Sequence, residues 1–125
     1  MSIGFLNWGL FFVAGDATIP SEKGTATMFV HSVFFWLRKD LTEEQRRAFQ
    51  DGLEGLKPIE AVQALYVGTP AATDRPIIDR SYSVALTVLF RDKAGCAAYE
   101  VHPLHKDFVR DFSSFWERII VYDAE

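Results

Sequence analysis

The side chains of this 125-residue chain best suited to acid–base chemistry are a tyrosine and a histidine near its carboxyl end. Tyr99 precedes His105, and His105 shares helical spacing with Phe108 and Phe112. A phenol and an imidazole in one apolar cavity can share a substrate proton, with the histidine as base and the tyrosine polarising a carbonyl. A buried Tyr–His hydrogen bond that only joins two helical segments is the alternative, and spacing alone favours it.

Two further polar residues, His31 and Asp123, are candidates for supporting roles. His31 alternates with Phe29 and Val33 on an apolar strand face, where a lone histidine is more often a satisfied core residue than a functional one. Asp123 shares its parity with Val121 on the last predicted strand, so its carboxylate could orient a histidine and fix its tautomer. A solvated strand end is the alternative for Asp123.

Metal and cofactor chemistry find little support in the motifs. His102 and His105 flank Pro103 three residues apart, but two ligands are too few for a closed site, and HExxH, CxxC and clustered carboxylates are missing. We therefore predict no metal and no cofactor. The sequence also lacks GxSxG, Walker A and GxGxxG motifs, which disfavours serine hydrolysis and nucleotide chemistry.

The elements that must position these residues begin at Met28. The run 28–37 is rich in β-branched and aromatic residues and predicts a strand that is apolar on both faces. Thr42 then opens a T-E-E-Q capping box, and Gly55 and Pro58 end the predicted helix. The apolar stripe of this helix consists of Phe49, Leu53 and Leu56.

Two strands, a divided helical region and a last strand follow. The predicted strands are Ile59–Gly68, Ser81–Phe90 and Ile119–Tyr122, with a Pro- and Asp-containing loop between the first two. The second is expected to line one face with Tyr82, Val84, Leu86, Val88 and Phe90. Asp92 caps a short predicted helix and Pro103 starts another. The apolar residues of that helix are Leu104, Phe108, Phe112 and Phe115.

The resulting order β-α-β-β-α-β predicts an α+β, ferredoxin-like fold with a four-stranded antiparallel sheet. Helices on one face would leave the other face bare, although the strands are apolar on both. We therefore predict that two subunits pair their sheets as a homodimer, forming a dimeric α+β barrel.

The net charge and the single cysteine indicate which partners and which compartment to expect. The net charge is −4 and no run of Lys or Arg exceeds two, which argues against nucleic acid or an anionic membrane as a partner. The single Cys96 cannot form an internal disulfide, so a reducing, cytoplasmic compartment is predicted, with Cys96 packed and inert.

The first 27 residues differ in composition from the rest of the chain. Ile3–Ala14 is apolar, but no basic residue precedes Lys23 as a secretory signal requires, and a membrane span needs about 20 apolar residues, so neither is well matched. We assign residues 1–27 to an N-terminal extension and residues 28–125 to one domain. An ordered arm, a linker and a start codon placed too far upstream remain alternatives for the extension.

The segments FVHSVFF, TEEQ and, above all, Y-x-x-H-P-x-H followed by SFWE resemble the stress-responsive A/B barrel (Dabb) family. The resemblance extends from Met28 to Asp123. The nearest functional analogue in that family is olivetolic acid cyclase, a cofactor-free enzyme that closes a linear polyketide by aldol condensation. By this resemblance its catalytic tyrosine falls on Tyr99 and its catalytic histidine on His105, with supporting positions on His31 and Asp123.

The resemblance implies a pocket between helices and sheet for a small apolar or aromatic carbonyl compound. We expect its walls to include Phe29, Phe35, Phe108 and Phe112. A non-enzymatic ligand-binding or stress-protective dimer is one alternative. A cofactor-free monooxygenase, suggested by analogy with the related dimeric barrels, is another.

Overall fold

Strand β1 (Phe29–Leu37) lies at the centre of the fold and pairs on both sides. The computed structural model describes residues 27–125, so the expected extension lies outside the described residues except for Thr27. The side chains of β1 alternate strictly between buried and half-buried, as its apolar alternation predicted. His31 therefore belongs to the same buried face as Phe29 and Val33.

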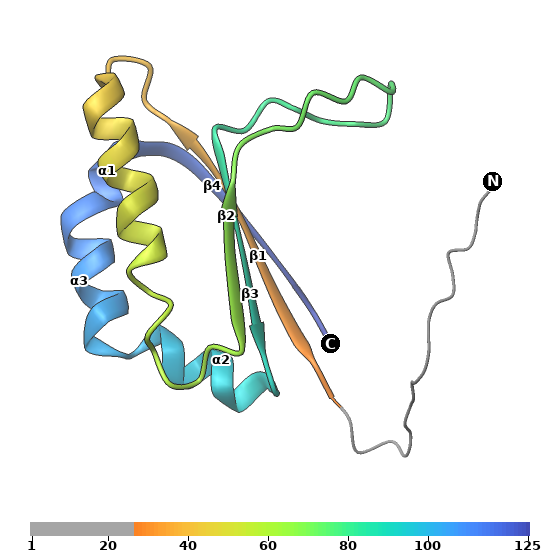
Figure 1. The fold of residues 1–125 in the computed structure, drawn as a ribbon, viewed down its shortest axis with the longest axis vertical. Helices are drawn as coiled ribbons and strands as arrows, with labels where there is room; N and C mark the ends of the chain where they lie inside the picture. Colours follow the sequence, from red (N-terminus) through yellow and green to blue (C-terminus); the bar gives the residue numbers. More distant parts are fainter. Residues whose placement is uncertain (1–26) are drawn as a thin grey trace.

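The described elements form one antiparallel sheet in the order β2-β3-β1-β4 (Figure 1). After β1 they are α1 (Glu43–Glu54), β2 (Ala64–Gly68), β3 (Val84–Phe90), α2 (Lys93–Glu100), α3 (Pro103–Phe112), a 3-10 turn (Ser113–Phe115) and β4 (Trp116–Ala124). This is the predicted ferredoxin-like arrangement, with the second helical connection divided into α2 and α3.

The helices begin where the sequence placed their caps. The Gln45 backbone N–H donates to Thr42 Oγ1 at 3.0 Å, and the Thr42 N–H donates to Gln45 Oε1 at 2.8 Å, which completes the capping box of α1. Asp92 caps α2 by accepting from the Gly95 N–H, and Pro103 occupies the first turn of α3. These caps set the residues at which the helices start.

The strands begin and end at other residues than predicted, because pairing between strands sets their ends. Residues 59–62 form turns, and Ile59 is apolar because it is buried there and not because it belongs to β2. Pairing of β3 with β1 ends at Val84, so Tyr82 precedes the strand and does not share its buried face. Its ring instead contacts Phe34, at 5.2 Å between centroids. The last strand is longer than predicted because it pairs along almost all of β1.

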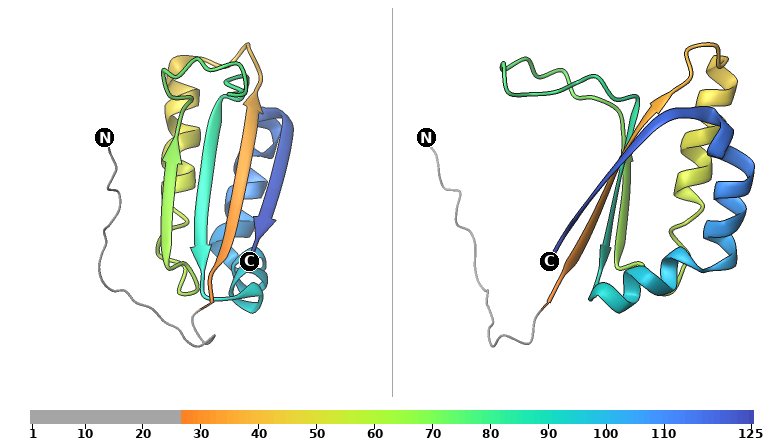
Figure 2. Two further views of the ribbon diagram at one scale, coloured as in Figure 1. Left: turned by 90° about the vertical axis from the view of Figure 1, so that its right-hand side faces the viewer. Right: turned by 180° about the vertical axis from the view of Figure 1, so that it is seen from behind.

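All the helices cover one face of the sheet (Figure 2). The residues of the core lie between that face and the helices, with Phe49 and Leu53 of α1 fully buried. The opposite face carries half-buried and exposed side chains, including Phe34 and Trp36 of β1. Within the described residues, no helix has the length and apolar character needed to cross a bilayer. The predicted cytoplasmic location stays a prediction.

Candidate functional site

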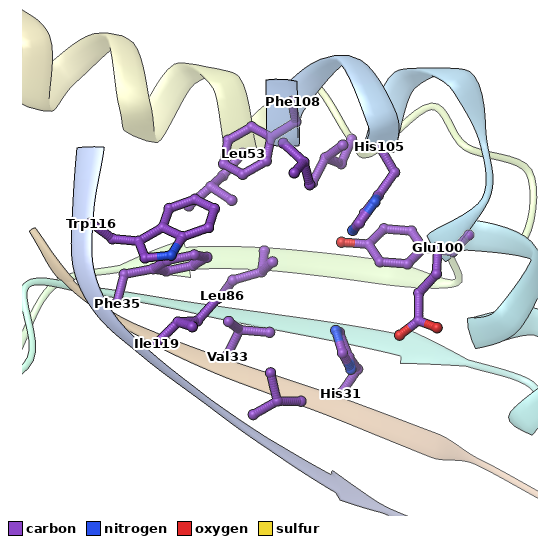
Figure 3. Close-up of a pocket in the computed structure, with 14 residues that line it drawn as sticks. His31, Val33, Phe35, Leu53, Leu86, Glu100, His105, Phe108, Trp116 and Ile119 are labelled. Carbon is purple, nitrogen blue, oxygen red and sulfur yellow. The ribbon is translucent and has the colours of Figure 1, made fainter. Parts of the chain in front are cut away.

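A cavity of about 210 Å³ lies between the helices and the covered face of the sheet (Figure 3). Strands β1 and β3, helices α1 to α3 and strand β4 all contribute to its lining. Its polar side chains are His31, Tyr99, Glu100 and His105. Most of the remaining wall is aliphatic or aromatic, so a bound molecule would meet few competing hydrogen-bond partners.

The turn between α2 and α3 brings Tyr99 and His105 together. The His102 N–H donates to the Tyr99 carbonyl at 3.1 Å, and His102 Nδ1 accepts from the Leu104 N–H at 3.0 Å. His102 thus caps α3, and the Tyr99 and His105 rings meet edge to face with centroids 4.8 Å apart. The cap also directs His102 away from this cavity, so it forms no histidine pair with His105 there.

Burial sets the protonation states of this pair. Burial, followed by the nearby Cys96 and Glu100, raises the pKa of the Tyr99 hydroxyl, which therefore stays protonated and able to donate. Burial also lowers the pKa of His105 from its ordinary 6.5, although Glu100 opposes this effect and His31 adds to it. At neutral pH the site therefore combines a neutral imidazole with a protonated phenol.

His31 and Asp123 face each other directly across β1 and β4. Their Nδ1 and Oδ1 atoms lie 2.6 Å apart, with the His31 side chain almost buried and the Asp123 side chain 42% exposed. A hydrogen bond from Nδ1–H to this carboxylate orients the His31 ring. The His31 ring also lies edge to face with Tyr99, 5.9 Å between centroids, so Tyr99 contacts both histidine rings.

Of the four phenylalanines expected in the walls, Phe35 and Phe108 line the cavity and Phe29 and Phe112 do not. Phe29 lies beyond His31 along β1, where its ring packs near Phe90. Phe112 lies on the side of α3 that faces α1, and a Cβ added at Gly52 would come within 2.6 Å of its ring. Shared strand parity or helical spacing cannot distinguish the cavity from the packed core beside it.

Several residues that line the cavity were not predicted as part of it, Glu100 and Trp116 among them. Glu100 follows Tyr99 and extends its carboxylate toward His31, as Figure 3 shows. Trp116 lines the cavity from the start of β4. Helical spacing could have indicated Glu100, which lies four residues after the buried Cys96.

Burial, followed by Glu100 and Asp123, raises the pKa of the Cys96 thiol to about 12.

The chain is similar to known proteins both in its sequence pattern and in its fold. The family model of the stress responsive A/B barrel domain matches residues 29–125. No curated protein sequence matches the chain. Among solved structures, a Dabb family protein with a ferredoxin-like fold from Mesorhizobium loti is 28% identical, with a TM-score of 0.63 over 78% of this chain and 95% of that one.

Two further structures share the fold at lower identity. A dimeric protein of unknown function from Bacteroides fragilis is 24% identical, covering 78% of this chain and 95% of that one with a TM-score of 0.62. A hydroxynitrile lyase from Passiflora edulis is 20% identical, covering 79% and 93% with a TM-score of 0.68. Because the family model spans the whole described sheet and its helices, the chain belongs to the stress-responsive A/B barrel domain family.

Proposed function

We propose that this protein binds a small apolar or aromatic carbonyl compound in the cavity and catalyses cofactor-free acid–base chemistry of the aldol type. The observation that carries the proposal is the contact between a buried, protonated Tyr99 and a neutral His105 in an apolar cavity. A base and a hydrogen-bond donor beside one apolar space are the groups that an enolisation requires.

The steps follow from the two protonation states. His105 removes a proton from the carbon next to a substrate carbonyl, and the Tyr99 hydroxyl donates to the oxygen that becomes an enolate. The enolate carbon attacks a second carbonyl carbon of the same molecule, so one carbon–carbon bond forms and an alkoxide results. The imidazolium of His105 then returns its proton to that alkoxide, which leaves both side chains as they began.

His31 and Asp123 act as positioning residues in this proposal. The 2.6 Å contact holds the His31 ring in one tautomer and orientation against Tyr99. A fixed Tyr99 ring keeps its hydroxyl directed at the developing oxyanion, and such preorganisation is a large part of electrostatic catalysis. The apolar wall strengthens these interactions because it excludes water.

The similar solved structures support catalysis only through the fold that they share with this chain. One structure with this fold is a hydroxynitrile lyase, so the fold accommodates an enzyme. Its identity of 20% gives this argument the weight of fold analogy alone. The assignment of Tyr99 and His105 therefore rests on their geometry and on the family motif.

The test is turnover of a poly-β-keto substrate by the purified full chain. We expect His105→Ala to reduce the rate by about 100-fold or more, the usual loss when a general base is removed. His102→Asn is the matched control, because asparagine preserves the α3 cap and His102 lies outside the cavity lining. Unchanged turnover in His105→Ala would show that the base is assigned wrongly.

A ligand-binding protein without chemistry is the second candidate, favoured by the largely apolar lining of the cavity. It predicts that an aromatic ketone is bound and recovered unchanged. Formation of product by the purified protein would exclude it. Oxygen uptake in the same assay would instead support the cofactor-free monooxygenase.

The open face of the sheet supports a homodimer. Tyr66 and Tyr122 are 64% and 63% exposed there, and the rings of Tyr82 and Tyr122 both contact Phe34. Large aromatic side chains on an uncovered sheet face are typical of an interface. The second subunit would cover this face, on the opposite side of the sheet from the cavity.

A further inference from the structure

Three metal-ligating side chains meet where α2 packs against β1. His31 from β1, with Cys96 and Glu100 from α2, brings one nitrogen, one sulfur and one oxygen within 4.8 Å of one another. The Cys96 sulfur lies 3.9 Å from both His31 Nδ1 and Glu100 Oε2. We propose that these three side chains bind a divalent transition metal such as zinc, with the fourth position left to water.

The two distances to the Cys96 sulfur approach those of a tetrahedral site, whereas the three ligand atoms together lie within 4.8 Å of one another. Zinc lies about 2.3 Å from sulfur and about 2.0–2.2 Å from nitrogen or oxygen, so neighbouring ligand atoms lie roughly 3.3–3.7 Å apart. The two sulfur distances of 3.9 Å exceed this by a few tenths of an ångström. Because Glu100 is exposed, its side chain can rotate toward the other two ligands.

The backbone already holds the ligands in register. Cys96 and Glu100 are four residues apart on α2, which places them one above the other on the same helix face. His31 is fixed opposite them because β1 pairs with strands on both sides. The ligands therefore come from two rigid elements, as a stable site requires.

The donor set selects the kind of metal. One thiolate, one imidazole and one carboxylate suit zinc and its chemical relatives, whereas magnesium and calcium prefer oxygen ligands alone. Cys96 is only 4% exposed, but the Glu100 side chain is exposed and Asp123 is partly so. The carboxylates thus provide a path from solvent to the buried sulfur.

Asp123 connects this site to the protonation of His31. Its Oδ1 lies 2.6 Å from Nδ1, the nitrogen nearest the Cys96 sulfur. A metal bound at Nδ1 would take the place of the proton that donates to Asp123. The His31–Asp123 hydrogen bond and metal binding are therefore alternative states of the same residues.

Cobalt(II) is the probe, used with the reduced, untagged full chain. Four-coordinate cobalt bound to thiolate gives a charge-transfer absorption in the near ultraviolet together with strong visible bands. We expect these bands to saturate at one cobalt per chain and to disappear when zinc is added. Cys96 is the only cysteine in the sequence, so Cys96→Ser removes the charge-transfer band.

Glu100→Gln is the decisive second variant, because position 100 is exposed and the substitution does not disturb the core. We expect it to weaken cobalt binding at least as much as the roughly 10- to 100-fold that loss of an outer-shell partner costs. Glu117→Gln, an exposed carboxylate on β4, is the matched control and should bind as the unmodified chain does. Unchanged affinity in Glu100→Gln, or the absence of a charge-transfer band in the folded protein, overturns the proposal.

The metal site stands independently of the proposed catalysis, because its test measures binding. A bound metal would occupy His31 and separate it from Asp123. Zinc is therefore expected to inhibit any turnover that depends on the His31–Asp123 pair, and to do so less in Glu100→Gln.

Discussion

Replacing Tyr99 with phenylalanine separates a catalytic hydroxyl from a structural one. Tyr99 is 1% exposed, and its ring contacts both His31 and His105 edge to face. Within residues 27–125, its hydroxyl makes no hydrogen bond that meets ordinary geometric limits. Phenylalanine keeps the ring and its contacts and removes only this oxygen.

Tyr99→Phe should change the free energy of unfolding and the turnover rate to very different extents. A buried tyrosine hydroxyl with a protein partner contributes about 1 kcal/mol, whereas one without a partner contributes little or costs stability. We therefore expect Tyr99→Phe to leave the free energy of unfolding unchanged or to raise it, by up to about 1–3 kcal/mol. Loss of an oxyanion donor costs about 100- to 1,000-fold in turnover, so the rate should fall by that factor.

Urea denaturation and turnover of a poly-β-keto substrate measure the two quantities on the same preparation. Tyr66→Phe is the matched control, since Tyr66 is 64% exposed on the opposite face of the sheet. It should leave turnover unchanged. A destabilisation of about 1.5 kcal/mol in Tyr99→Phe with the substrate still turned over normally would refute the reasoning, because it would show a structural hydrogen bond.

Three further predictions concern protonation, the core and assembly. Burial lowers the pKa of His105, so the unfolded chain binds more protons than the folded one at acidic pH, and the free energy of unfolding should fall as the pH drops below 6.5. In urea titrations at several pH values, His105→Gln should flatten this pH dependence. Phe49→Ala should cost about 3–5 kcal/mol in the same assay, since Phe49 is fully buried, and Phe49→Leu should cost less. Tyr122→Glu should halve the mass measured by light scattering if the open face forms the dimer, whereas Ile77→Glu, at a 79% exposed loop position, should not.

The prediction for Phe49 depends on an aromatic cluster around that residue. Its ring lies 5.0 Å from Phe35 and 5.6 Å from Phe108, measured between centroids. Removing it leaves a space that these rigid rings cannot readily fill. A loss below about 1 kcal/mol would show that the neighbouring rings rearrange.

The order of elements and their caps could be predicted because they depend on neighbours in sequence. The capping box at Thr42 and the proline at the start of α3 are local patterns, and both are present. Strand ends were predicted less well, since β2 and β3 begin where pairing begins and not where apolar residues do. Tyr82 was misplaced for the same reason.

By itself the sequence determined the ferredoxin-like order, the buried face of β1 and the identity of the polar residues, because alternation and helical spacing specify faces. Only the tertiary structure decided which of those residues meet. The β1–β4 register pairs His31 with Asp123, and the α2–α3 turn places Tyr99 against His105. Packing likewise decided that Phe35 borders the cavity, whereas Phe29 lies in the core and Phe112 packs against it. Distances between segments far apart in the chain depend on pairing and packing, which local periodicity does not encode.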